Sequence, residues 1–132
     1  MFGNIYQDKK VLITGHTGFK GAWLTTWLLR LGASVVGISK DIPTKPSMFE
    51  ELKLQNKIKH HQVDIRDLSK IIDIVSSEKP DFLFHLAAQP IVSTSYHEPI
   101  ETISSNVMGT TNILESLRIS NHKCTVIIIT SD

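Results

Sequence analysis

The chain has 132 residues, of which 41% are hydrophobic and 20% are charged, and its formal net charge is +1. These proportions are typical of one globular domain, and the charge balance gives no reason to expect a nucleic acid or an anionic membrane as a partner. The single cysteine, Cys124, excludes an internal disulfide framework and is expected to be an inert thiol. The lack of an apolar run of roughly 20 residues and of a signal peptide favours a cytoplasmic location.

Predicted strands and helices alternate along the chain. The β-rich runs predict strands over residues 11–14, 34–39, 61–65, 82–86 and 125–130, and helices are expected over 22–31, 48–56, 68–77 and about 98–117. Gly32 follows the first helix as a stop signal, Ser47 and Glu50 form a capping box, and Asp67 is the expected N-cap of the third helix. This alternation predicts an α/β fold with a parallel sheet.

The sharpest local signal is a glycine-rich turn between the first strand and the first helix. It consists of Gly15, His16, Thr17, Gly18, Phe19, Lys20 and Gly21. Gly15 permits a tight turn, Gly18 lets backbone amides approach a pyrophosphate, and Gly21 lets the helix pack against the strand. The turn therefore indicates a dinucleotide site, and the alternative is that its glycines serve only a tight connection.

Candidates for the rest of such a site follow the next three strands. Asp41 ends the second strand, where an acid would hold the adenine ribose; it could also be only a turn residue, and Lys40 could favour a 2′-phosphate. Asp64 could accept from the adenine amino group while Ile65 packs on the ring, or Asp64 could cap the next helix. The residues that end the fourth strand would let a cofactor lie against the backbone, or else serve tight packing: Leu86, Ala87 and Ala88.

These motifs together resemble the extended short-chain dehydrogenase/reductase family. The matching segments are Thr14 to Gly21, Asp64 to Asp67, His85 to Ala88, Asn106 to Thr110, and Thr125 to Asp132. The resemblance implies a Rossmann-like, doubly wound parallel sheet with five strands in the order 3-2-1-4-5, forming an NAD-binding domain over residues 1–132. Within the family, the glycine loop and the Gln89-Pro90 pair are similar to the branch that dehydrates CDP-glucose.

That resemblance implies a lyase that uses NAD to remove water from the nucleotide sugar CDP-glucose. NAD would take hydride from sugar C4, water would leave across C5 and C6, and the hydride would return to C6. By the same analogy, Asp132 would be the general acid and Ser131 would hydrogen-bond O4 of the sugar, although Asp132 alone reads as a terminal carboxylate. Gln89 and Tyr96 would contact the substrate, and Asn106 would face the cofactor or else lie on a helix surface.

The family's catalytic Tyr-x-x-x-Lys is expected after the fifth strand and is not found there. Tyr6 and Lys10 match it formally but precede the glycine loop. The chain is therefore expected to be part of a longer enzyme, inactive alone, with an apolar fifth strand that favours self-association. The helix over 98–117 would form a homodimer or homotetramer interface. Another NAD-dependent nucleotide-sugar epimerase or dehydratase, and a nicotinamide-binding sensor without catalysis, stay open.

Two further pairs are interpreted as structural. His60 and His61 are adjacent in a strand, so their side chains would point to opposite faces and would not share a metal; we expect both to be solvated, and we expect no metal site. Trp23 and Trp27 lie four residues apart on the first helix, and we expect them to pack in the core.

Overall fold

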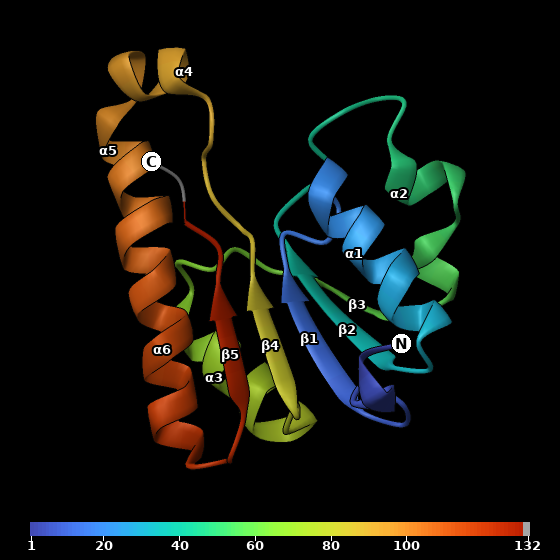
Figure 1. The fold of residues 1–132 in the computed structure, drawn as a ribbon. Coiled ribbons are helices and arrows are strands. Elements are labelled where there is room, and N and C mark those ends of the chain that lie inside the picture. The colour runs from blue at the N-terminus through green and yellow to red at the C-terminus, as the bar shows by residue number, and fades with distance from the viewer. Residues whose placement is uncertain (131–132) are drawn as a thin grey trace.

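The computed structural model describes residues 1–130 and contains a five-stranded parallel sheet (Figure 1). The strands are β1 (Lys10–Thr14), β2 (Ser34–Ser39), β3 (Lys59–Gln62), β4 (Phe82–His85) and β5 (Thr125–Ile128). Their order is β3-β2-β1-β4-β5, and every neighbouring pair is parallel. The predicted Rossmann-like fold and strand order are confirmed.

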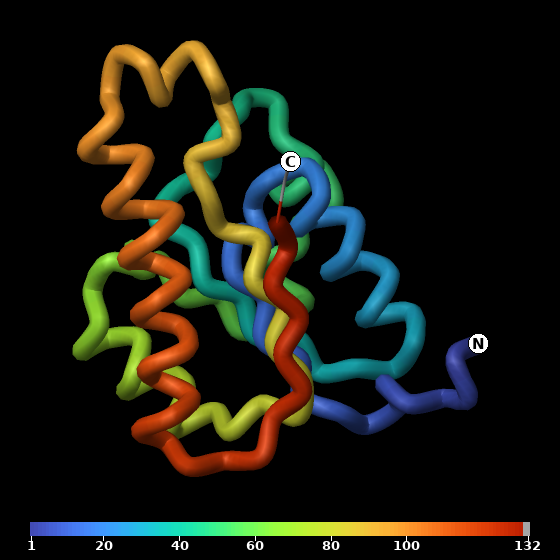
Figure 2. The backbone as a smooth tube through the Cα atoms, turned by 60° about the vertical axis from the view of Figure 1, so that its left-hand side comes forward, coloured from blue at the N-terminus to red at the C-terminus, as the bar shows by residue number. Residues whose placement is uncertain are grey.

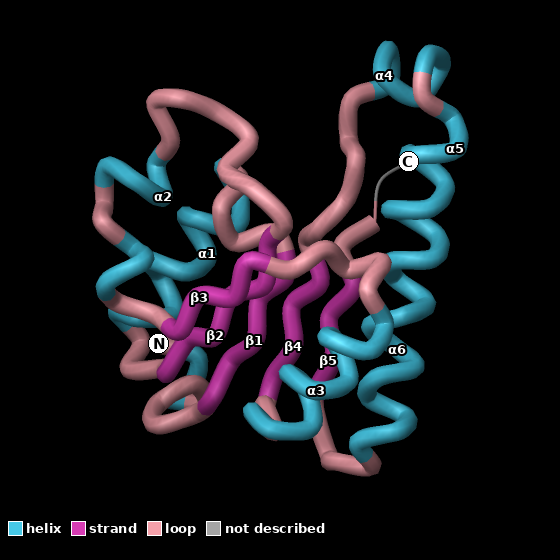
Figure 3. The backbone as a smooth tube through the Cα atoms, turned by 180° about the vertical axis from the view of Figure 1, so that it is seen from behind, coloured by secondary structure: helices cyan, strands magenta, loops and turns pink. Residues whose placement is uncertain are grey.

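Helices cover both faces of the sheet. They are α1 (Phe19–Arg30), α2 (Met48–Glu51), α3 (Leu68–Glu78), α4 (Val92–His97), α5 (Pro99–Ile103), the π-helical η3 (Ser104–Met108) and α6 (Gly109–Ser120), with 3₁₀ turns η1 (Phe2–Asn4) and η2 (Leu54–Asn56). Figure 3 shows α3 and α6 over β4 and β5, while α1 and α2 lie on the other side of the sheet (Figure 2). Alternate residues of β1 feed the two cores: Leu12 packs toward α3 and α6, and Ile13 packs toward α1.

The third strand, Lys59–Gln62, begins two residues and ends three residues earlier than the predicted range 61–65. It is an edge strand with a wholly polar sequence, so no apolar run marks it. Asp64 and Ile65 consequently lie in the loop that follows the strand. Asp67 caps α3 as predicted, because its carboxylate accepts from the Lys70 amide at 3.2 Å.

The helix predicted over 98–117 is present as one helical run over residues 99–120, made of α5, η3 and α6, whereas the preceding helix α4 was not predicted. Glu98 has φ −128°, which breaks the helical path, and Pro99 then starts α5 at a position where its missing N–H costs nothing. The π-helical turn η3 continues the helix from α5 into α6, because the residues at both junctions keep right-handed helical backbone angles. The shorter helix predicted over 48–56 is divided into α2 and η2, because Lys53 adopts a left-handed conformation between them. Ser47 caps α2 as predicted, because its hydroxyl accepts from the Glu50 amide, but the Glu50 carboxylate accepts from the Ser47 hydroxyl and not from the Ser47 amide, as a full capping box requires.

The two tryptophans of α1 lie on its outer face, so the core placement expected for them is wrong. Trp23 is 57% exposed and Trp27 is 47% exposed, where it packs edge-on against Phe2. The face of α1 that meets the sheet and α2 buries mainly small residues, including Gly21, Ala22 and Thr25. A helix that lies this close to its neighbours leaves no room there for indole rings.

The strand β5 forms one edge of the sheet and pairs only with β4. Its apolar side chains are half-buried, and Ile129 just beyond it is 49% exposed. The expected apolar edge is therefore present, although the strand is not buried on both faces. Burial raises the pKa of the neighbouring Cys124 thiol to about 11, in agreement with an inert thiol. Within residues 1–130, no helix is both long and apolar enough to cross a membrane.

Candidate functional site

The glycine-rich turn sits at the carboxyl end of β1, where α1 begins. Gly15 has φ +76°, a conformation that glycine adopts without strain, and its amide donates to the Ile38 carbonyl at 2.8 Å. A Cβ on Gly21 would lie 2.7 Å from the Cα of His16, so this position has no room for a side chain. A Cβ on Gly18 would meet only the Gly15 carbonyl oxygen, at 3.5 Å. The turn is thus tightly packed beneath and open at Gly18.

The open side of this turn is the start of α1. Gly18 is the N-cap and supplies no side-chain cap, and the first turn of the helix contains Lys20 and no acid. The first amides of a helix have no intrahelical acceptor and carry partial positive charge. Phe19 and Lys20 are exposed beside them. This donor set fits the diphosphate of a dinucleotide.

Thr17 ties the turn to the end of β2. Its hydroxyl donates to the Asp41 carbonyl at 2.6 Å and lies 2.7 Å from the Ser39 hydroxyl. The exposed Asp41 is therefore held next to the glycine-rich turn. This arrangement places a free carboxylate where the ribose of a dinucleotide is held in Rossmann-type domains.

A network of charges joins the ends of β2 and β3 to α5. Arg66 binds Asp64 through Nη2 at 2.6 Å and Glu101 through Nη1 at 2.5 Å, and Lys40 lies 3.5 Å from Glu101. The hydrogen bonds from Arg66 lower the pKa of Asp64. Asp64 does not cap α3, because Asp67 provides that cap. The side chain of Ile65 is 7% exposed and packs in the core beside α6, so it does not face the open side of this network.

The segment after β4 passes close to the glycine-rich turn. The Thr14 hydroxyl accepts from the amides of Leu86 and Ala87, both at 3.1 Å, and a Cβ on Gly15 would lie 2.9 Å from the Ala87 nitrogen. Ala88, next in this segment, is exposed. Small residues here keep the backbone near the open face of the turn.

A buried histidine links this segment to the π-helical turn. His85 lies 2.6 Å through Nδ1 from the Thr14 hydroxyl and 2.9 Å through Nε2 from the Thr110 hydroxyl. Because Thr14 already accepts two amides, its proton points to Nδ1, and Nε2–H of His85 donates to Thr110. Thr110 in turn donates to the Asn106 carbonyl at 2.7 Å. Burial lowers the pKa of His85 to about 4, so the ring is neutral near pH 7.

Asn106 faces the β4 loop and not the outer helix surface. Its Oδ1 accepts from the Gln89 amide at 2.7 Å, and its Nδ2 donates to the Gln89 carbonyl at 3.1 Å. The Gln89 side chain binds Thr102 and the backbone of Ile91. Tyr96 on α4 is 81% exposed. The two predicted catalytic residues, Ser131 and Asp132, lie outside the described residues.

The histidine pair of β3 is only partly as expected. His60 and His61 point to opposite faces, but His60 is half-buried and hydrogen-bonds the buried His16, so its expected solvation is wrong. His61 is also half-buried and lies 3.6 Å from Glu78. No local sequence pattern predicts the His16–His60 contact, because 44 residues separate the two histidines in the sequence. Within residues 1–130, no group of three His, Cys, Asp or Glu side chains could hold a metal ion.

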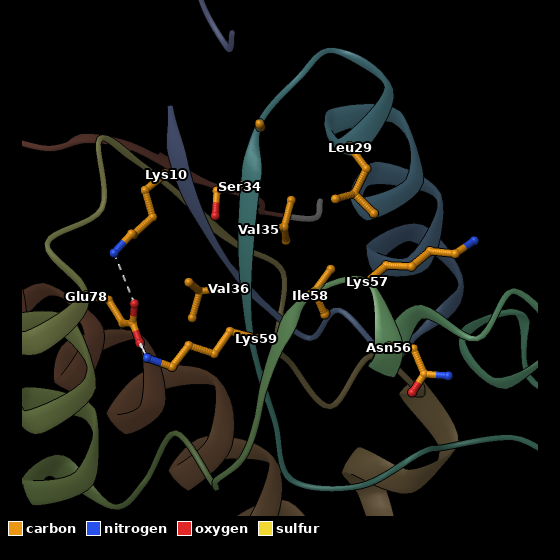
Figure 4. Close-up of a pocket in the computed structure, with 11 residues that line it drawn as sticks. Lys10, Leu29, Ser34, Val35, Val36, Asn56, Lys57, Ile58, Lys59 and Glu78 are labelled. Carbon is orange, nitrogen blue, oxygen red and sulfur yellow. Dashed lines mark hydrogen bonds and ion pairs between the residues drawn. The ribbon is translucent and has the colours of Figure 1, made fainter. Parts of the chain in front are cut away.

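A hollow of about 490 Å³ lies at the opposite end of the strands, around the amino ends of β1, β2 and β3 (Figure 4). The buried Glu78 pairs there with Lys10 at 3.2 Å and with Lys59. Burial raises the pKa of Glu78, but the hydrogen bonds from the two lysines outweigh it and leave the pKa lowered. Ligands of open α/β sheets bind at the carboxyl ends of the strands, so this hollow is separate from the candidate site.

The strand order and the glycine-rich turn define a Rossmann-type domain. The sequence model of the family described as GDP-mannose 4,6 dehydratase matches residues 12–132. The chain belongs to this family.

Individual relatives agree with that assignment. The chain is 48% identical over 129 residues to the CDP-glucose 4,6-dehydratase of Salmonella typhimurium, covering 98% of this chain and 36% of the relative. It is 33% identical over 122 residues to a GDP-mannose 4,6-dehydratase of Yersinia enterocolitica, covering 85% and 32%. The chain thus spans about a third of the length of the curated relatives that it matches.

Solved structures show the same architecture. The UDP-glucose 4-epimerase of Thermus thermophilus, in complex with NAD, has a TM-score of 0.75 and 27% identity, over 85% of this chain and 34% of that structure. The UDP-glucose 4-epimerase of Thermotoga maritima, with UDP-glucose, has a TM-score of 0.79 and 27% identity, over 90% and 37%.

Proposed function

We propose that this chain is the cofactor-binding part of an NAD-dependent nucleotide-sugar 4,6-dehydratase that acts on CDP-glucose. The observation that supports this most strongly is the 48% identity to a CDP-glucose 4,6-dehydratase across 98% of the chain. Identity to the GDP-mannose 4,6-dehydratase of Yersinia enterocolitica is lower, at 33%. The whole enzyme would be a homodimer or homotetramer.

NAD would lie across the carboxyl ends of the strands. Its diphosphate would meet the first amides of α1 at Gly18, and its adenosine half would extend toward Asp41 and Asp64. Its nicotinamide half would extend toward Ala87 and Asn106. When bound, NAD would supply a hydride acceptor and donor, which lets the dehydration proceed with no net oxidation.

The chain's own residues would position the reactants. Asn106 holds the backbone of Gln89 through two hydrogen bonds and so fixes the loop beside the nicotinamide end. Tyr96 is exposed on α4, which stands beyond the carboxyl end of β4, and there it would contact the sugar nucleotide (Figure 1). Ser131 would hydrogen-bond O4 of the sugar, and Asp132 would protonate the departing C6 hydroxyl.

The charges near the ribose end support NAD over NADP. Asp41 would accept from the ribose hydroxyls and would repel a 2′-phosphate. Lys40, the neighbouring cation, lies 3.5 Å from Glu101 and belongs to a network that also contains Arg66 and Asp64. An extra phosphate would have to displace Glu101 from these cations.

Substrate turnover tests the proposal. The protein expressed from the complete reading frame that carries this chain is incubated with NAD and, separately, CDP-glucose, GDP-mannose and UDP-glucose. Mass spectrometry is expected to show conversion of CDP-glucose to a product that is lighter by one water. Dehydration of GDP-mannose and UDP-glucose is expected to be much slower. Dehydration of another nucleotide sugar in preference would contradict the CDP-glucose assignment. NAD binding without any turnover would contradict catalysis and favour a nicotinamide-binding sensor.

A further inference from the structure

The middle of β2 contains a gap that a ring of the glycine-rich turn fills. Gly37 is the register partner of Ile13 on β1 and of His60 on β3. A Cβ at Gly37 would lie 2.5 Å from the Cγ and Cδ2 atoms of His16. Glycine inside a strand weakens it and marks a close approach. Here the approaching group is the imidazole of His16.

The imidazole of His16 is enclosed on every described side. Its residue is 0% exposed, its ring lies edge-on to Phe49 with centroids 5.3 Å apart, and its Nε2 lies 2.7 Å from Nδ1 of His60. His16 is the residue directly after Gly15, so its ring hangs beneath the turn whose upper side would meet the diphosphate. The pair of rings therefore joins the turn to the outermost strand of the sheet.

The protonation of this pair follows from its surroundings. Burial lowers the pKa of His16 to about 4, with a smaller contribution from His60, so the ring is neutral near pH 7. The backbone of Ile38 opposes that shift, and Nδ1 of His16 has no hydrogen-bond partner within residues 1–130. The 2.7 Å contact between the rings needs one donor and one acceptor, so it holds the two imidazoles in a fixed tautomeric arrangement.

We propose that His16 is a positioning residue for dinucleotide binding: its ring, seated over Gly37 and hydrogen-bonded to His60, fixes the turn from Gly15 to Gly18 in the shape that receives the diphosphate. The inference rests on the proposed function, because it assumes that the turn binds NAD. It adds a side-chain contact beneath the turn to the glycines that allow the turn to pack tightly. The turn and β3 are thereby held as one unit.

Variants of His60 test the proposal without altering the turn. His60→Leu leaves Nε2 of His16 buried without a partner, and we expect NAD affinity at pH 7.5 to fall roughly tenfold by calorimetry. His60→Gln keeps a side chain that can donate or accept and is expected to restore most of the affinity. His61→Leu changes the adjacent residue on the opposite face and is expected to bind NAD like the wild type. The combination of His16→Phe with His60→Leu is expected to cost no more than the larger single change, because one interaction is removed.

A spectroscopic measurement on the wild type tests the pair independently of NAD. Long-range ¹H–¹⁵N NMR is expected to show His16 in a single tautomer, unchanged between pH 8 and pH 6. An imidazole that averages between tautomers, or a His60→Leu variant that folds and binds NAD like the wild type, would overturn the proposal. If the wild type fails to bind NAD, the proposed function is wrong, and the tautomer measurement still decides whether the rings are paired.

Discussion

At the scale of single residues, His16 and His85 make the stability of the fold sensitive to acid. Burial lowers both pKa values to about 4 from 6.5, so the unfolded chain binds more protons than the folded chain between these limits. The free energy of unfolding is therefore highest above about pH 6.5 and falls as the pH drops toward 4. At pH 5 each histidine should cost about 2 kcal/mol of unfolding free energy.

Urea unfolding at a series of pH values measures this effect. Replacing His85 with Gln is expected to remove its share of the pH dependence, whereas replacing the exposed His97 with Gln is expected to leave the dependence unchanged. An unfolding free energy that stays flat from pH 7 to pH 5 would show that the two rings are not buried as neutral groups.

Two glycines of the turn are expected to respond differently to the same substitution. Gly21→Ala places a Cβ 2.7 Å from the backbone of His16 and should reduce the unfolding free energy by about 2 kcal/mol. Gly18→Ala meets only one atom, at 3.5 Å, and should change stability by less than about 0.5 kcal/mol. Thermal and urea unfolding compare the two variants. Equal destabilisation by both would contradict the packing described beneath the turn.

Sequence reasoning located the residues whose role is local and missed those whose role depends on distant contacts. The capping residues Ser47 and Asp67 were predicted correctly, because a cap lies within a few positions of the group that it satisfies. The partnership of His16 with His60 was missed, because only the register of β2 against β3 brings the rings together. Trp27 was misplaced because helical spacing identifies a face without saying whether that face is inner or outer.

At the scale of elements, α5 joins the ends of β2 and β3 through Glu101. Replacing Glu101 with Gln frees Lys40 and removes a negative charge near the ribose end of the site. We expect affinity for NADP relative to NAD to rise several-fold, and more at low salt, because the groups are exposed and screened. The ratio of the two dissociation constants measures the effect.

Glu115 on α6 provides the matched control for this variant, because it forms an exposed ion pair with Arg118 away from the site. Glu115→Gln is expected to leave the cofactor ratio unchanged. An unchanged ratio in Glu101→Gln would show that the charge network does not contribute to the choice of cofactor.

The elements themselves were predictable where an apolar pattern marks them. The strands β1, β2 and β4 are central and apolar, and their sequence runs identify them. The edge strand β3 is polar, and its predicted range was displaced by two residues at the start and three at the end. Helix α4 was missed because it buries no residue and so has no apolar pattern, and the π-helical turn was missed because helical apolar spacing does not mark its wider turn.

At the scale of the whole molecule, an exposed apolar stripe runs along the outer side of α5, η3 and α6. It consists of Ile100, Ile103, Val107 and Leu114, which are between 48% and 84% exposed. We expect this stripe to form the homodimer interface, because contiguous exposed apolar surface on a helix pair favours association. Ile103→Glu combined with Val107→Glu should weaken dimerisation at least roughly tenfold, by light scattering over a range of concentrations.

The control for dimerisation is Trp23→Glu, which replaces an exposed apolar residue of α1 with a negative charge. This variant is expected to dimerise like the wild type. Equal loss of association in both variants would indicate general stickiness of exposed apolar surface, and an unchanged dimer in the double variant would place the interface elsewhere.

The account's central claim is that the start of α1, opened by Gly18, receives the diphosphate of NAD. Its most direct test is calorimetric titration of NAD into the wild type and into Gly18→Ala at pH 7.5, with circular dichroism confirming that both are folded. The account predicts saturable binding at one site by the wild type and roughly tenfold weaker binding by the variant. A folded wild-type protein that does not bind NAD, or equal affinity in the two proteins, would contradict it.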